Sequence, residues 1–68
     1  MQMIFSNDPV ILAVDLNELH LQEGDIGRVR SSWHYPNPAY EVEFPIVDQG
    51  LVRVLLFAHQ VRPLAKAK

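Results

Sequence analysis

Apolar and acidic residues alternate along Tyr40-Glu41-Val42-Glu43-Phe44, and a period of two is typical of a strand with one buried face. The alternation predicts a strand over Ala39–Phe44. We expect Pro45 to end it, because proline lacks the N–H that a strand ladder needs. The apolar members of the alternation are expected to point inward and the two glutamates outward.

A second strand, Asp25–Ser31, is predicted after the turn marked by Gly24. Its apolar residues are Ile26 and Val29, whose spacing departs from strict alternation. Glycine inside a strand often marks a bulge or the close approach of another chain segment. We therefore expect Gly27 to have one of these two roles.

Three further strands follow from apolar runs bounded by turn residues. The first run predicts a strand over Val10–Val14, whose β-branched side chains favour a strand over a helix. The most apolar run predicts a strand over Leu51–Phe57, after a glycine-containing turn. A 3-10 turn at Ala58–Gln60 is then expected to lead into a last strand, Val61–Arg62, closed by Pro63.

The two longest connections differ in character. Asp15–Glu23 is acidic and too short for a stable helix. We expect it to be a loop in which three leucines fold over the core, namely Leu16, Leu19 and Leu21. The connection 32–38 contains prolines and an asparagine together with Trp33 and Tyr35, so it is also expected to be a loop.

Five short strands joined by turns predict an all-β fold, a small five-stranded SH3-like β-barrel. Residues 1–68 are expected to form a single domain, with 1–7 and 65–68 flexible. The inward positions of the strands predict a core of Val10, Leu12, Ile26, Val29, Tyr40, Val42, Phe44, Val54, Leu56 and Val61.

The amino-acid composition excludes several classes of function. A chain of 68 residues without cysteine has no disulfides and no thiolate metal sites. Its three histidines lack ligand spacing, so no metal site is expected. No serine lies in a nucleophile motif, and we expect no catalytic residues, no cofactor and no enzymatic activity. Without a long apolar run or a secretory leader, the sequence predicts a cytoplasmic protein that does not enter membranes.

Four stretches of the sequence resemble a family of small bacterial proteins of unknown function, the DUF4926 family. They are Val10–Leu12, Leu21–Val29, Tyr40–Phe44 and Gln60–Leu64. The resemblance implies an SH3-like barrel and brings no established activity. The Gly-Asp-x-Gly-x-Val block within the second stretch is also similar to the glycine-centred turn of KOW-type barrels, which occur in ribosomal and transcription proteins.

The likeness to KOW-type barrels makes a nucleic-acid interface one alternative function. Its candidate residues are Arg28, Arg30 and Arg53, which are expected on one outer face. Glu41 and Glu43 are expected on the strand between them, where cross-strand ion pairs would neutralise the arginines. Because the formal net charge is also −2, we expect no nucleic-acid partner.

Apolar side chains at expected surface positions are the best candidates for partner contact. Trp33 and Tyr35 occur where an exposed loop is normally polar, so they either bind a partner or cap an open end of the barrel. In an SH3-like barrel their loop flanks a groove opposite the acidic loop. Leu55 and Phe57 share the outward face of their strand with an arginine. They indicate a protein partner, a homodimer, or a cover formed by Met1–Phe5.

These observations predict a non-catalytic binding module that acts on an unidentified protein or on a second copy of itself. Polyproline recognition is not expected, because the aromatic triplet of PxxP-binding SH3 domains is absent from the first strand and its loop. The alternatives are a KOW-like nucleic-acid-binding barrel and an accessory or antidote protein paired with the product of a neighbouring gene. Genomic neighbours and the solution size would discriminate among them.

Overall fold

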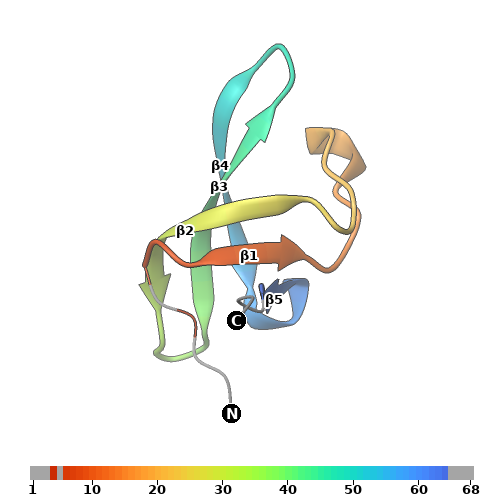
Figure 1. Cartoon of the computed structure of the whole chain (residues 1–68). Coiled ribbons are helices and arrows are strands. Elements are labelled where there is room, and N and C mark those ends of the chain that lie inside the picture. The colour runs from red at the N-terminus through yellow and green to blue at the C-terminus, as the bar shows by residue number, and fades with distance from the viewer. Residues whose placement is uncertain (1–3, 5, 65–68) are drawn as a thin grey trace.

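The computed structural model describes residue 4 and residues 6–64 of the chain. Within them, five strands and two short 3-10 turns follow one another (Figure 1). In chain order the elements are β1 Pro9–Leu12, η1 Asn17–Leu19, β2 Ile26–Trp33, β3 Ala39–Ile46, β4 Gly50–Phe57, η2 Ala58–Gln60 and β5 Val61–Pro63.

All the strands belong to one antiparallel sheet with the order β4-β3-β2-β1-β5. The first four strands form a meander, and β5 returns to pair with β1 so that Val61 lies opposite Leu12. Figure 1 shows β1 and β2 running across the direction of β3 and β4, so the sheet curls around a shared interior. The expected small, five-stranded, barrel-like all-β fold is confirmed. The closer likeness to SH3-like barrels stays a prediction.

The core lies inside this curl and contains most of the predicted residues. Its buried members are Ile4, Val10, Leu12, Leu21, Val29, Tyr40, Val42, Phe44, Leu56 and Val61. Val54 is half-buried and packs against them. The prediction for Ile26 was wrong, because its side chain is 52% exposed. The inward positions of that part of β2 are occupied by Gly27 and Val29.

The acidic loop contributes unequally to the core. Leu21 is buried and Leu16 is half-buried against the core, as expected of both. Leu19 is exposed, contrary to expectation, because η1 lifts it away from the interior. A two-residue bridge between Leu16 and Leu21 closes this loop on itself.

The ends of three strands differ by two residues from the sequence prediction, and the other strand boundaries differ by one residue or agree. β1 ends at Leu12 instead of Val14, and β2 continues beyond Ser31 to Trp33. β3 passes through Pro45 to Ile46. This is tolerated because Pro45 lies beyond the last β3 residue that pairs with β2 and has a ladder partner on β4 alone.

A β-bulge in β2 changes the direction of its last residues. β2 pairs with β3 up to Val29 and again from Ser31, with a register shift between them. Arg30 is therefore the extra residue. Because side chains alternate, Trp33 counted from the buried Val29 would point into the core. The extra residue reverses the alternation, so Trp33 pairs with Ala39 on the outer face of the sheet.

The chain ends were expected to be flexible. Residues 1–3, 5 and 65–68, on which most of that expectation falls, lie outside the described residues. Among the described ones, Ile4 is buried in the core. The backbone N–H of Asn7 donates to the carbonyl oxygen of Val29 at 2.6 Å. These two contacts attach the segment before β1 to the sheet.

Candidate interaction surface

The outer face of β2, β3 and β4 brings together side chains that are far apart in the sequence. In the row nearest the β2–β3 loop, Ala39 of β3 lies between Trp33 of β2 and Phe57 of β4. We call this row the aromatic end of the sheet. In the next row, Glu41 lies between Ser31 and Leu55.

Ala39 shows how closely the aromatic end is packed. It belongs to the outward set of β3, yet only 9% of its surface is exposed. Directly opposed residues of an antiparallel pair have Cβ atoms about 4.5–5.5 Å apart, so the large side chains on either side cover the small one. Trp33 and Phe57 thus border a shared apolar surface across three strands, while about half of each side chain stays exposed.

β4 presents apolar side chains outward on both sides of Arg53. Leu51, Leu55 and Phe57 are exposed, whereas Leu56 is buried. This is the orientation predicted from the alternation around Arg53. Beside the aromatic end, the ring of Phe57 stacks on that of His59 with centroids 6.4 Å apart. A hollow of about 300 Å³ lies there, lined by Asn37, Pro38, Phe57, Ala58 and His59.

The two aromatic residues predicted in the β2–β3 loop lie differently. Trp33 is the last residue of β2 and is 47% exposed, while Tyr35 lies in the loop and is 90% exposed. Neither is buried within the described structure, so the idea that one of them caps the interior gains no support. The signal that sequence reasoning missed is the bulge, which places Trp33 beside Ala39 and Phe57.

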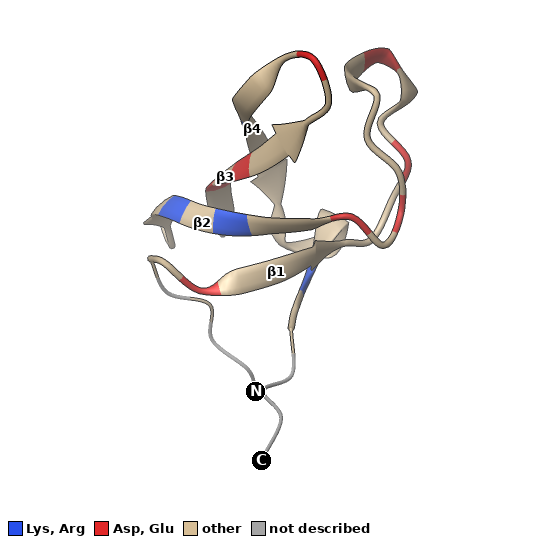
Figure 2. Ribbon diagram, turned by 45° about the horizontal axis from the view of Figure 1, so that its top comes forward, with Lys and Arg blue, Asp and Glu red and all other residues tan. Residues whose placement is uncertain are grey.

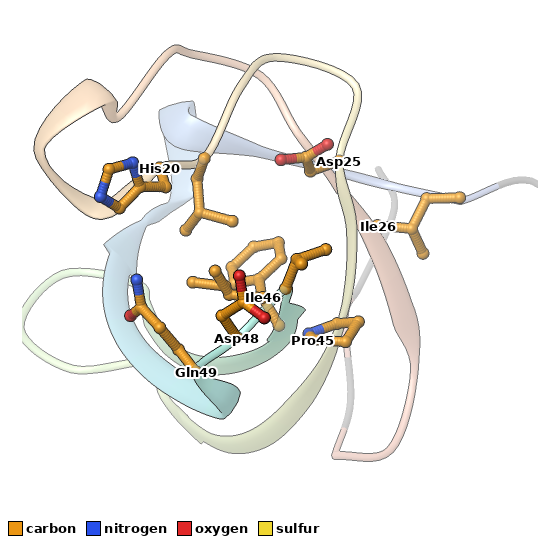
Figure 3. A pocket seen from close by; sticks show the side chains of 10 residues that line it. His20, Asp25, Ile26, Pro45, Ile46, Asp48 and Gln49 are labelled. Carbon is orange, nitrogen blue, oxygen red and sulfur yellow. The ribbon is translucent and has the colours of Figure 1, made fainter.

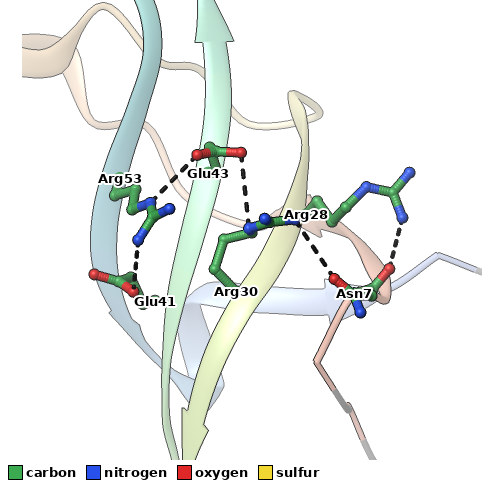
Figure 4. A network of polar contacts seen from close by, with 6 residues as sticks. All are labelled: Asn7, Arg28, Arg30, Glu41, Glu43 and Arg53. Atoms are coloured by element: carbon green, nitrogen blue, oxygen red, sulfur yellow. Dashed lines mark hydrogen bonds and ion pairs between the residues drawn. The ribbon is translucent and has the colours of Figure 1, made fainter.

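The three arginines proposed for nucleic acid are engaged with other groups (Figure 4). Arg53 contacts Glu43 at 3.2 Å (Nε–Oε2) and Glu41 at 3.6 Å (Nη1–Oε1). Arg30 Nε lies 3.9 Å from Glu43 Oε1. Glu43 thus lies between a cation of β2 and a cation of β4, which confirms the predicted alternation of charge across the sheet.

Arg28 behaves differently from the other two arginines. Its backbone lies opposite Glu43, but its Nη1 donates to the carbonyl oxygen of Asn7 at 2.6 Å. The side chain therefore holds the segment before β1 against β2. Figure 2 shows the basic segments of β2 near an acidic segment of β3, with further acidic segments in the loop between β1 and β2. The charges of this face are interleaved, and they form no continuous basic track.

A larger hollow of about 640 Å³ lies between the acidic loop and the β3–β4 hairpin (Figure 3). Sequence reasoning did not predict it, because its polar residues come from separate turns. They are His20, Asp25, Asp48 and Gln49, and Phe44 is among the apolar residues that line the hollow with them. The acidic loop therefore lies beside the β3–β4 hairpin, at the end of β2 opposite the aromatic end (Figure 1). A peptide groove would require the acidic loop to lie beside the β2–β3 loop instead.

A family model described as "Domain of unknown function (DUF4926)" matches residues 6–53. This chain belongs to the DUF4926 family. The match confirms the resemblance carried by the sequence. No curated protein matches the chain, and no solved structure does either. The part matched to DUF4926 includes Trp33, Tyr35 and the charged rows, whereas Leu55 and Phe57 lie beyond it.

The described part of this DUF4926 chain contains neither a cluster of metal-ligating side chains nor a membrane-spanning helix. Among residue 4 and residues 6–64, no group of three or more histidine, cysteine, aspartate or glutamate side chains is arranged to hold a metal ion. No helix within the same residues has the length and apolar character needed to cross a bilayer.

Proposed function

We propose that this DUF4926 chain is a non-catalytic protein-binding module and that its aromatic end is the contact surface. The cytoplasmic location expected from the sequence is part of this proposal. The observation that carries it is the row in which Trp33 and Phe57 border Ala39 across three strands. Leu55 lies in the next row on β4, and Tyr35 follows Trp33 by two residues in the β2–β3 loop.

The character of this surface supports binding to protein. Aromatic side chains are enriched in protein interfaces, where they provide large contact areas for a small loss of side-chain entropy. Here two of them are fixed on a paired sheet, which limits the ordering that binding requires. The ion pairs of Arg53 with Glu41 and Glu43 form a polar border next to the apolar surface.

The placement of reactive residue types supports a module without catalysis. Ser31 and Ser32 are strand residues of β2, whereas His20 follows η1 and His59 belongs to η2. Activation of a serine nucleophile needs a base within hydrogen-bonding reach. These residues belong to separate elements, and the histidine nearest the proposed surface stacks on Phe57.

Nucleic-acid binding is the weaker alternative, because Arg30 and Arg53 are paired with carboxylates and backbone phosphates are bound chiefly by available positive charge. An accessory or antidote role with a neighbouring gene product is a special case of protein binding. The identity of the captured partner would decide that case.

Photo-cross-linking in the native host tests the proposal. A photoreactive phenylalanine analogue replaces Tyr35 or Leu55 in turn, and Val47 of the β3–β4 turn serves as the matched control because it is also exposed but lies away from the aromatic end. We expect discrete protein adducts from the first two positions and none from the third. Trp33→Ser should weaken the adduct formed at position 35. Absence of adducts, or equal adducts at position 47, would contradict the proposal.

A further inference from the structure

β4 is an edge strand of the sheet. It pairs with β3 over all eight of its residues, from Gly50 opposite Ile46 to Phe57 opposite Ala39, without a register shift. Within the described residues no strand pairs with its other side. Edge strands of monomers are normally protected by proline, lysine, a bulge or an overlying segment. β4 contains no proline, no lysine and no bulge.

The backbone groups on the open side of β4 can be assigned from one hydrogen bond. The N–H of Phe57 donates to Oε1 of Gln60 at 2.9 Å, so it is directed away from β3. In an antiparallel pair, successive residues direct their N–H and C=O groups to alternate sides. The corresponding groups of Leu51, Arg53 and Leu55 are therefore also directed away from β3, toward the open edge.

We infer that a second copy of this chain pairs with β4 edge to edge, antiparallel, about a two-fold axis at Val54. This inference rests on the proposed function, because it names a protein that is bound, at a contact that shares Phe57 with the aromatic end and extends from it along the edge of β4. The sequence of β4 has apolar residues at matching distances on either side of Val54, except that Arg53 corresponds to Leu55. Pairing about Val54 places Leu51 opposite Phe57 of the second copy and Val52 opposite Leu56. Apolar side chains then face each other on both sides of the ten-stranded dimer sheet.

The charges of β4 suit this arrangement. Arg53 is the strand's one charged residue, and its own protomer already pairs it with Glu41 and Glu43. It would lie opposite Leu55 of the second copy, whose own ladder neighbour on β3 is Glu41. Each guanidinium therefore meets an acidic row, not the other guanidinium, and no uncompensated charge is brought to the axis.

The register follows from the same alternation. Arg53 and Leu55, whose backbone groups are directed toward the open edge, form hydrogen-bonded pairs with Leu55 and Arg53 of the second copy, while the N–H of Phe57 stays bonded to Gln60. Val54 faces itself in a non-hydrogen-bonded pair, with Cα atoms about 4.5 Å apart. That distance lies within the range that a disulfide can span. The chain has no native cysteine, so a single introduced thiol reports on the register.

Cross-linking by introduced thiols is the first test. Val54→Cys and Val52→Cys both replace a half-buried valine of β4. Under mild oxidation we expect the Val54→Cys variant to form a disulfide-linked dimer in high yield. The Val52→Cys variant should stay unlinked, because its two copies would lie about 13 Å apart along the strands. Equal cross-linking of the two variants, or none, would overturn the inferred register.

Sedimentation equilibrium of the unmodified chain is the second test. We expect a dimer that dissociates on dilution, with a dissociation constant raised about tenfold or more by Leu55→Lys, since an edge lysine opposes pairing. Val47→Lys adds the same charge at an exposed position outside β4 and should leave the constant unchanged. Thermal unfolding of dilute monomer should show that both variants are folded.

The two tests separate failure of this inference from failure of the proposed function. A chain that stays monomeric at hundreds of micromolar, but gives a heterologous adduct from position 35 or 55, refutes the homodimer and retains protein binding. A monomer without any adduct refutes both. A dimer insensitive to Leu55→Lys overturns the β4 interface even though the chain self-associates.

Discussion

Gly27 of β2 lies against the ring of Phe44 of β3 with no room for a side chain between them. A Cβ atom built on Gly27 would stand 2.7 Å from Cε1 of Phe44 and 2.7 Å from Cγ1 of Val42. Carbon atoms in contact are normally about 3.5–4.0 Å apart. Of the two roles expected for this glycine, the close approach is confirmed, and the bulge falls further along the strand.

Gly27→Ala should therefore lower the free energy of unfolding by about 1–3 kcal/mol, the usual cost of overpacking a filled core. Ile26→Ala is the matched control, because Ile26 precedes it on the same strand and is exposed; its effect should be about 0.5 kcal/mol. Urea denaturation gives both values. Adding Phe44→Leu to Gly27→Ala should cost less than the sum of the single changes, whereas strict additivity would contradict the proposed contact.

Two valines of the sheet interior should differ in their response to truncation. Val42 is fully buried and Val54 is half-buried. Val42→Ala should lower the free energy of unfolding by about 2 kcal/mol, through lost burial and a residual cavity. Val54→Ala should cost about half as much. Both are measured by urea denaturation of dilute protein, so that self-association does not contribute. A larger cost for Val54→Ala would contradict the half-buried position of Val54 on the edge strand.

We expect weak nucleic-acid binding, because Glu41 and Glu43 neutralise the charges of Arg30 and Arg53. The natural chain is expected to bind labelled oligonucleotides no more tightly than the ~10⁻⁴–10⁻⁶ M typical of non-specific contacts. The double variant Glu41→Gln and Glu43→Gln removes the carboxylates that pair with Arg30 and Arg53. It should bind more tightly, with an affinity that falls as salt rises. Fluorescence anisotropy measures both, and micromolar binding by the natural chain would instead favour the nucleic-acid alternative.

Trp33 and Tyr40 form a matched pair of aromatic residues on opposite faces of the same sheet. Tyr40 is buried, so Tyr40→Ser should lower the free energy of unfolding by about 3–5 kcal/mol. Trp33→Ser should cost only about 1 kcal/mol or less, because it removes a half-exposed side chain. In dilute protein the fluorescence of Trp33 should be readily quenched by acrylamide. Strong protection from quenching would place this side chain inside the fold.

The alternation of residue types was sufficient to predict β3 and β4, because each buries one face and pairs in a continuous register. It failed in β2, where two features that no alternation encodes occur. Gly27 occupies an inward position without a side chain, which left Ile26 as the apparent inward residue. The shift at Arg30 then reversed the facing of Trp33. Both depend on how neighbouring strands fit together and are not visible within β2 itself.

The sequence predicted the individual residues of the candidate surface, but it did not predict that Trp33 and Phe57 lie in one row. The sequence drew attention to Trp33 and Phe57 separately, as a loop aromatic and a strand residue. Their adjacency requires the register of β2 on β3 and of β3 on β4, with Ala39 as the shared neighbour. Pairing between strands is fixed by long-range packing, so one strand's sequence cannot specify it.

The pairing of β1 with β5 determines when this small domain can complete its fold. β3 and β4 are joined by a tight turn and pair through local contacts, which close quickly. Leu12 and Val61 come from opposite ends of the chain, and their encounter carries the largest loop-closure entropy. During synthesis the β3–β4 hairpin can form before β5 has been made. The side of β1 that pairs with β5 then remains unpaired. Until Val61 is made, one wall of the core stays open, and the nascent chain exposes apolar surface beside β1, which becomes an interior strand only when β5 pairs with it.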